Sequence, residues 1–350
     1  MVKKRNYGID LLRLVLMFMV CILHTLGQGG ILSASKIGTF NYKIFWLLEI
    51  ISYCAVDGFA IISGYMGLDK KQKYEKISEM WFQVVFYSFI LTLIFTLLGI
   101  NNNFGIKEII KCLMPVTFQK YWYFSAFFVL YLIMPAINNK IKKLNQNNAK
   151  KTLIIIIMMF SFTYIVSDPF KLKKGYSPIW LIIIYCIGAL AKKSKLLEKK
   201  KSITLITLWM LCILITWYTK VILKTDRLIN YVSPTILLSG LLMVILFSRI
   251  NIKGKIISKL TPLTFDIYLF QLNQVIWITY IANSLTKVAS KNLSIGLLYV
   301  FGFAILLFTL GLLVGFIRSK IFNLLKIKLL SKKIIYLIDR ILNIQIKLLK

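Results

Sequence analysis

Charged side chains are scarce in this sequence. They make up 16% of its 350 residues, whereas apolar residues make up 58%. Such a balance could not cover the water-facing surface of a soluble protein of this size. A soluble globular fold is therefore excluded, and the lipid bilayer must be the solvent for most of the chain.

The sequence also has few side chains that bind metals or form disulfides. Five cysteines lie in or beside apolar blocks, without metal-ligand spacing or a disulfide framework: Cys21, Cys54, Cys112, Cys186 and Cys212. His24 is the only histidine. We therefore expect no metal site and no permanently bound cofactor, and a base that works at neutral pH would have to be His24.

No linker, internal repeat or second globular domain is evident. The first apolar block lacks a cleavage site of small residues, so we expect it to remain as the first span. One membrane domain is predicted over residues 1–317. The tail 318–350 intersperses Leu and Ile with Lys at near-helical spacing, which predicts one or two amphipathic helices lying on the anionic inner leaflet.

The expected fold class is all-α, a polytopic bundle of about ten transmembrane helices with both termini in the cytoplasm. A helix of about 20 residues crosses the hydrocarbon core and satisfies its own backbone polar groups. Two of the expected spans are short, at 152–167 and 177–191. The others lie near 9–28, 44–66, 81–100, 121–138, 203–223, 232–249, 262–283 and 294–317.

The position of the basic residues explains the net charge of +33. With the N-terminus inside, 31 of the 45 lysines and arginines fall on the cytoplasmic side and 13 on the opposite side. This asymmetry follows the positive-inside rule. The charge is thus mainly a topology signal, and we expect no nucleic-acid partner.

Polar groups within the spans are functional candidates, because a charge at the bilayer centre costs about 2.5–3.5 kcal/mol on insertion scales. Arg13 and His24 are eleven residues apart, so on a helix they point the same way, about 16 Å apart along the axis. With Asp10 they predict the wall of a polar cavity. The remaining candidates are Glu49, Asp57, Asp266, Gln271, Asn273 and Gln274.

Each of these groups has two interpretations. A single buried imidazole such as His24 is commonly structural, but histidine also suits proton transfer near neutral pH. Arg13, paired with Asp10, would either hold an anionic ligand or only orient the span. Asp57 and Asp266 are both candidates for orienting the imidazole, and the sequence does not choose between them.

Two further segments carry candidate binding residues. Trp122 and Tyr123 open the fourth span at the expected outer face, where they fit either an aromatic belt or stacking on a sugar. The lysines after the second span fit either stop-transfer charge or an anion site for a phosphate-bearing cytosolic ligand. This segment comprises Ser63, Gly64, Tyr65, Lys70, Lys71, Lys73 and Lys76.

Four segments together resemble one family, the integral membrane acyltransferases of the acyltransferase-3 type, which O-acylate bacterial cell-surface glycans. The opening span of the family looks like NYGIDLLRLVLMFMVCILH, with its Arg and His at Arg13 and His24. Its second-span FxxISGY signature is similar to VDGFAIISGYMGLDKKQKYEKI. Its WFLxALxxLYLxxP and SxxxFGIYLIH stretches resemble YWYFSAFFVLYLIMP and KLTPLTFDIYLFQ.

The resemblance implies a multi-pass enzyme of the bacterial plasma membrane. It implies acyl-CoA as the cytoplasmic co-substrate, with no permanently bound cofactor. The implied acceptor is a hydroxyl of a cell-surface or lipid-linked polysaccharide, most simply for O-acetylation. Arg13 and His24 would be the catalytic pair. The acyl-CoA site would use Ser63, Tyr65, Lys70, Lys71 and Lys73.

This chain departs from the family pattern at three points. Lysines replace the R-x-x-R pair after SGY, Asp266 replaces a Gly, and Gln271 replaces a His. In the expected chemistry, His24 deprotonates the acceptor hydroxyl, which attacks the thioester directly. The alternative route passes through a covalent acyl-histidine. The alternative function is a transporter or flippase for a lipid-linked glycan.

Overall fold

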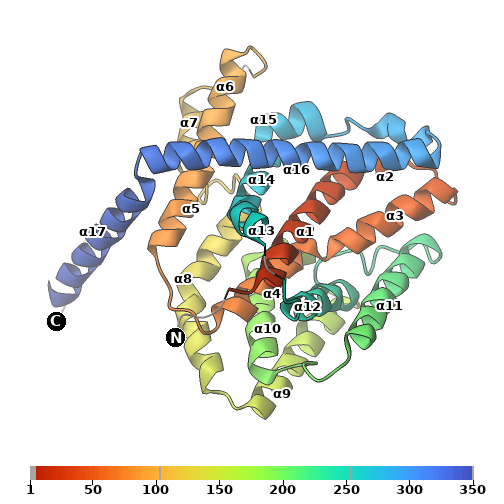
Figure 1. The fold of residues 1–350 in the computed structure, drawn as a ribbon, viewed down its shortest axis with the longest axis horizontal. Helices are drawn as coiled ribbons and strands as arrows, with labels where there is room; N and C mark the ends of the chain where they lie inside the picture. Colours follow the sequence, from red (N-terminus) through yellow and green to blue (C-terminus); the bar gives the residue numbers. More distant parts are fainter. Residues whose placement is uncertain (1–4, 102–103, 253, 349–350) are drawn as a thin grey trace.

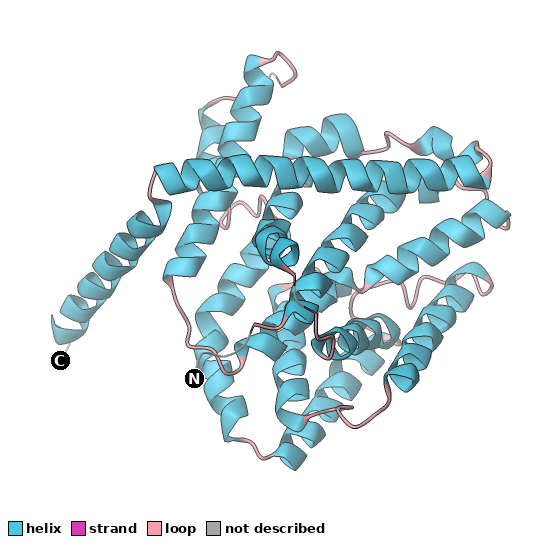
Figure 2. Ribbon diagram, in the orientation of Figure 1, coloured by secondary structure: helices cyan, strands magenta, loops and turns pink. Residues whose placement is uncertain are grey.

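The computed structural model describes residues 5–101, 104–252 and 254–348, which form helices and, within these ranges, no strand (Figures 1 and 2). The all-α prediction is therefore confirmed. Six helical stretches of the described chain are long and apolar enough to cross a membrane: Tyr7–Ala34, Phe40–Gly67, Glu75–Leu97, Trp122–Lys143, Ser202–Val221 and Leu293–Leu324. The chain is a multi-pass membrane protein, while the count of ten spans and the side of each terminus stay predictions.

The four other expected spans correspond to shorter or interrupted helices. α10 (Pro178–Ser194) and α12 (Pro234–Ser248) have 17 and 15 residues. α9 (Gln146–Ile156) continues as the π-helical segment η3 (Ile157–Phe162). The expected span 262–283 is broken into several short helices, so it is not one continuous membrane-spanning helix.

α1 (Tyr7–Leu23) lies at the centre of the bundle, in contact with α3, α4, α12, α14 and α16 (Figure 1). The helix begins at Asn6, whose side chain accepts a hydrogen bond from the backbone N–H of Ile9. It continues into the π-helical segment η1 (His24–Gln28). Because other helices surround α1, its polar side chains face protein rather than lipid.

The second span consists of α3 (Phe40–Tyr53) and α4 (Ala55–Gly67), and α10 packs against α4. At their crossing, a Cβ atom on Gly64 would overlap the carbonyl oxygen of Tyr185. A Cβ atom on Gly188 would overlap the carbonyl oxygen of Ile61. Gly64 of the SGY segment is therefore a packing residue, since small residues let helix backbones approach closely.

The third and fourth spans frame one side of the bundle. The third comprises α5 (Glu75–Val85), the π-helical segment η2 (Phe86–Ile90) and α6 (Leu91–Leu97). The short α7 (Ile106–Leu113) lies beside η2. α8 (Trp122–Lys143) then forms the fourth span.

α16 (Leu293–Leu324) has small side chains toward the bundle and large apolar ones outward. Gly311 and Gly315 are buried, and a Cβ atom at either would lie 2.7 Å from atoms of α14, whereas Leu298 and Leu313 are 71% and 60% exposed. An apolar outer surface of this kind fits lipid rather than water. The helix includes the start of the expected tail, since it passes through 318 without a break.

The remaining helices complete the described chain. α17 (Ile327–Leu348) follows α16 and contacts α5, so this part of the tail is helical, while its place on the inner leaflet stays a prediction. The other elements are α2 (Ile31–Ala34), η4 (Lys173–Gly175), α11 (Ser202–Val221), α13 (Lys255–Leu260), η5 (Thr261–Leu263), α14 (Thr264–Gln271), α15 (Gln274–Ile276), η6 (Trp277–Ile281) and η7 (Thr286–Ser290).

The break after α14 is the feature that positions the site. The side chain of Asn273 accepts hydrogen bonds from the backbone N–H groups of Val275 and Ile276, and donates one to the carbonyl oxygen of Tyr87 at 3.0 Å. These bonds satisfy backbone groups that the interruption would leave unpaired inside the bundle. The break brings Gln271 and Trp277, on either side of it, to the same turn of α1.

Candidate active site

His24 lies where α1 changes from α-helical to π-helical geometry, a kind of irregularity that is frequent at functional sites. Its Nδ1 atom is 3.0 Å from Oε1 of Gln271. The edge of the imidazole meets Trp277, with ring centroids 5.2 Å apart at 86°. An amide oxygen can only accept, so Nδ1 donates the hydrogen bond and Nε2 keeps a free lone pair that can take a proton.

The residue that orients His24 is thus an amide, not one of the two carboxylates considered from the sequence. Asp57 is fully buried and accepts a hydrogen bond from Nε1 of Trp180 at 3.4 Å. Asp266 is also fully buried and belongs to a different cluster. In the described part of the chain, neither carboxylate hydrogen bonds to His24, because each is held by a partner on another helix.

Asp266 forms a two-pronged ion pair with Arg318 of α16. Nε and Nη2 of Arg318 lie 2.8 Å and 2.6 Å from its two carboxylate oxygens, and the hydroxyl of Tyr87 donates to the same carboxylate at 2.9 Å. The pair therefore joins α14 to α16 and η2. Since Gln271 is on the same short helix as Asp266, the pair also fixes the helix that carries the partner of His24.

Sequence reasoning missed Arg318, which it placed in a cytoplasmic tail. One signal could have found it. Arginine is rare in this lysine-rich chain, and its planar group suits buried two-pronged pairing better than lysine does. Arg318 also stands seven residues after Gly311, and therefore on the same face of α16 that contacts α14.

Arg13 and Asp10 form the ion pair expected from the sequence, with Arg5 as a second partner. Nη1 of Arg13 is 2.7 Å from one oxygen of Asp10, and Nε of Arg5 is 2.5 Å from the other. Asp10 is buried, whereas the side chain of Arg13 is 28% exposed. One carboxylate thus positions two guanidinium groups at this end of α1.

Arg13 and His24 line the same inner cavity, as their spacing predicts, and its volume is about 230 Å³. The walls are mostly apolar and aromatic, with Tyr123 and Tyr268 among them, and Ser63 supplies a hydroxyl. The imidazole therefore faces a cavity of mainly apolar character.

Arg13 also lines a second, larger cavity of about 770 Å³ at the end of the bundle where the described chain begins. The walls of this basic cavity carry more positive than negative side chains. Its charged residues are Arg5, Arg13, Lys70, Lys192 and Arg249, together with Asp10, Asp69 and Glu198.

The lysines expected to bind acyl-CoA do not all lie at the same site. Lys70 and Tyr65 line the basic cavity, whereas Lys71 and Lys73 are exposed and line none of the cavities described here. The sequence analysis did not anticipate Lys192, whose ammonium lies 4.8 Å from the centre of the Tyr65 ring. Lys192 belongs to α10 and is far from Tyr65 in sequence, so no local pattern could reveal this contact.

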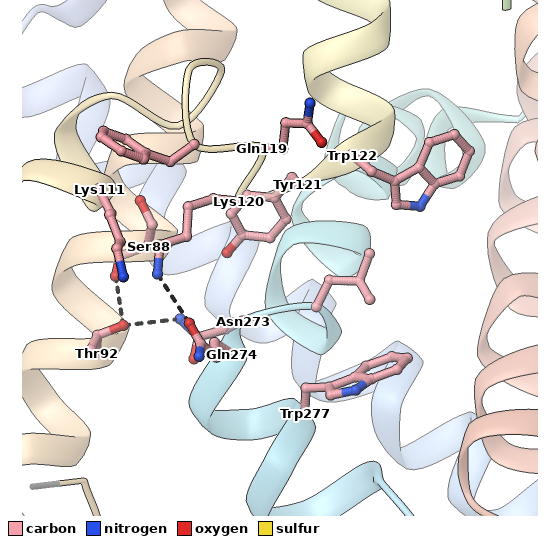
Figure 3. Close-up of a pocket in the computed structure, with 12 residues that line it drawn as sticks. Ser88, Thr92, Lys111, Gln119, Lys120, Tyr121, Trp122, Asn273, Gln274 and Trp277 are labelled. Atoms are coloured by element: carbon pink, nitrogen blue, oxygen red, sulfur yellow. Dashed lines mark hydrogen bonds between the residues drawn. The ribbon is translucent and has the colours of Figure 1, made fainter. Parts of the chain in front are cut away.

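A third cavity, of about 440 Å³, adjoins the inner cavity, with which it shares Trp122 and Leu272 (Figure 3). Figure 3 shows Trp122 and Trp277 on one side of it and Lys111 and Lys120 on the other. Trp122 is also a wall of the inner cavity, and Trp277 is the ring that contacts His24. The aromatic pair expected at the outer end of the fourth span, Trp122 and Tyr123, therefore lines the inner cavity together with His24.

The lysines of this outer cavity are not all available for a ligand. Lys120 pairs with Glu108 and donates a hydrogen bond to Oε1 of Gln274 at 3.1 Å. Lys111 pairs with Glu108 at 3.4 Å. Burial alone would raise the pKa of the Glu108 carboxyl, but the two lysines outweigh burial and hold that pKa below its usual value.

The three cavities succeed one another and share walls: Arg13 separates the basic cavity from the inner one, and Trp122 and Leu272 separate the inner cavity from the outer one. The helical bundle thus has a basic cavity, an aromatic cavity and a single imidazole in the inner cavity between them. Residues 6–324 match the family model described as an acyltransferase domain, Acyl_transf_3. The chain belongs to the acyltransferase-3 family and is a membrane acyltransferase. No curated protein and no solved structure matches it significantly.

Proposed function

We propose that this protein moves an acyl group, in the simplest case acetyl, from cytoplasmic acyl-CoA to a hydroxyl of a cell-surface or lipid-linked polysaccharide. The single observation that carries the proposal is the position of His24. Its imidazole faces the inner cavity and contacts Trp277, which lines the outer cavity. One base is thus within reach of ligands arriving from two directions.

The donor is proposed to enter through the basic cavity. Coenzyme A carries phosphates at one end and a thioester at the other, linked by a long, flexible chain. Arg5, Lys70 and Lys192 line the wide mouth, and Arg13 stands where that mouth meets the inner cavity. Lysines and arginines suit the phosphates, whereas the apolar inner cavity suits the pantetheine chain and the acyl group.

The chemistry then needs one proton acceptor. Nε2 of His24 takes the proton of the sugar hydroxyl as its oxygen attacks the thioester carbon. The carbon–sulfur bond breaks, the proton passes from the imidazole to the departing thiolate, and the free thiol of coenzyme A leaves. Gln271 keeps the lone pair of Nε2 directed at the reactants throughout, because Nδ1 is bound to its amide oxygen.

The acceptor is proposed to reach His24 from the outer cavity. Trp122 and Trp277 offer aromatic faces on which a sugar ring can stack. The partners required are therefore acyl-CoA, the acceptor glycan and the membrane lipids. The setting we propose is the bacterial plasma membrane.

The test uses labelled acetyl-CoA and membrane vesicles that contain the protein, with label measured in the polysaccharide fraction. His24→Gln should abolish transfer, by about 100-fold or more, since general base catalysis contributes roughly 10²–10⁴-fold. The matched control is Gln28→Ala, an exposed side chain of the same π-helical segment, which should keep full activity. Normal transfer by His24→Gln would refute the mechanism, and glycan movement without consumption of acetyl-CoA would identify a flippase instead.

A further inference from the structure

A fourth cavity, of about 450 Å³, shares no lining residue with the three already described. Its walls come from η1 and the segment after it, from α3 and from the residues around the end of α11. Figure 1 shows α2, the start of α3 and the end of α11 together at the right of the view, far from the N-terminus. On the predicted topology this is the extracytoplasmic side.

Glu49 lines this cavity and is only 7% exposed. Its Oε1 atom lies 3.3 Å from the position that a Cβ atom on Gly27 would occupy, while Oε2 is buried without a hydrogen-bond partner in the protein. A buried polar atom without a partner costs about 1–3 kcal/mol. A side chain larger than that of Gly27 would crowd the carboxyl, so the sequence makes room for it.

Trp46 stands one helical turn before Glu49 on α3 and lines the same cavity. Its Nε1 atom is also buried without a hydrogen-bond partner. The ammonium of Lys220 lies 4.1 Å from the centre of the indole ring and also pairs with Asp226. The wall therefore presents one indole donor and one carboxyl group, side by side, with Tyr42 and Tyr53 adding hydroxyl-bearing rings.

The charges of this cavity decide which class of ligand fits. The described residues contain no group of three side chains able to hold a metal ion, and the ammonium of Lys220 already lies over the Trp46 ring, where an organic cation would otherwise bind. An anion would be repelled by Glu49. Hydroxyl groups both donate and accept, so they satisfy the carboxyl group in either protonation state and also the indole N–H.

We propose that this cavity binds an uncharged sugar unit of the acceptor glycan, an inference that rests on the proposed function. Rings of Trp46 and Tyr53 beside polar groups are the composition that binds sugars, and the volume lies within the range of about 300–1,000 Å³ typical of small-ligand sites. Gly27 is three residues after His24 in the same π-helical segment. A sugar bound here therefore holds the glycan against the turn that carries the base.

The experiment measures binding of three neutral trisaccharides, maltotriose, cellotriose and N-acetylchitotriose, to the purified full-length protein by saturation-transfer NMR. At least one should bind, and trigalacturonate, an anionic trisaccharide, should bind more weakly. Trp46→Phe and Glu49→Gln should each weaken binding about fivefold or more, as expected for the loss of a hydrogen bond. Trp209→Phe is the matched control, since the Nε1 atom of Trp209 is also buried without a partner but lines none of the described cavities.

The outcomes separate this site from the proposed reaction. Binding is measured without acyl-CoA and on the His24→Gln protein, so it does not depend on turnover. Sugar binding without acetyl transfer would refute the reaction and keep the site. Absence of neutral sugar binding, preference for trigalacturonate, or equal loss in the Trp46→Phe and Trp209→Phe proteins would each overturn the sugar site, whatever the enzyme's activity.

Discussion

Oε1 of Gln271 lies 3.0 Å from Nδ1 of His24, and this contact joins residues 247 positions apart in the chain. A neutral amide thus orients the imidazole where many enzymes use a carboxylate. Within a membrane this has a physical advantage, because an amide fixes the ring without placing another charge in a medium of low dielectric constant.

The first prediction concerns this amide. Gln271→Leu should lower kcat about tenfold, since it removes one hydrogen bond that is worth about 1–1.5 kcal/mol. Gln271→Glu keeps an oxygen acceptor and should recover much of the lost rate. The measurement is acetyl transfer at saturating acetyl-CoA, with thermal unfolding of each variant as the check on folding. Equal loss in both variants would contradict the role assigned to the oxygen acceptor.

The second prediction concerns the buried pair of Asp266 and Arg318. Arg318→Met should reduce the free energy of unfolding by about 3–5 kcal/mol, because it leaves an uncompensated buried carboxylate. Adding Asp266→Leu should restore much of that loss. As a control, Asp226→Asn breaks an ion pair whose carboxylate side chain is 71% exposed and should cost at most about 1 kcal/mol. Denaturant unfolding in detergent measures the free energy of unfolding of each variant. A double variant less stable than Arg318→Met would contradict the prediction.

The third prediction concerns the crossing of α4 and α10. Gly64→Ala should destabilise the protein by about 1–3 kcal/mol, the usual range for overpacking, since the new methyl group meets a backbone carbonyl that cannot move aside. Gly302→Ala on α16 is the matched control, because nothing lies within 4 Å of its added Cβ atom. That variant should be neutral or more stable by up to about 1 kcal/mol. Thermal unfolding distinguishes the two, and equal effects would remove the packing role assigned to Gly64.

The fourth prediction separates lysines that line the basic cavity from those that do not. Replacing Lys70 and Lys192 together with Ala should raise the KM for acetyl-CoA about tenfold or more, because each charge-assisted hydrogen bond is worth about 1.5–3 kcal/mol. Replacing Lys71 and Lys73 with Ala should leave KM unchanged, since both are exposed away from the cavity. Initial rates at varied acetyl-CoA provide the measurement. The same KM for both double variants would mean that all four lysines serve only to set the orientation of the protein in the membrane.

Some parts of the site follow from local spacing and could be predicted. Arg13 and His24 line one cavity because eleven residues are close to three helical turns, and Asp10 pairs with Arg13 because residues three apart are neighbours on a helix. Trp122 marks the outer end because the fourth span begins there. In each case a single helix sets the relation between the side chains.

Other parts depend on contacts between helices, and local patterns could not reveal them. The choice of Gln271 over Asp57 or Asp266 depends on the chain break at Asn273 and on the capture of Asp266 by Arg318. The gathering of Lys70 with Lys192 depends on how α4 lies against α10. Each of these outcomes is set by residues far apart in sequence.

The sequence by itself determined that the protein is a helical membrane acyltransferase with one imidazole on the inward face of its first helix. Its apolar blocks, charge pattern and helical periodicity are local quantities, and lipid leaves helices as the simple way to satisfy the backbone. Only the tertiary structure decided which amide holds His24, where Arg318 pairs, and that Lys220 joins Trp46 and Glu49 in a separate cavity. Those relations arise where helices cross, because there the shape and charge of distant residues must fit together.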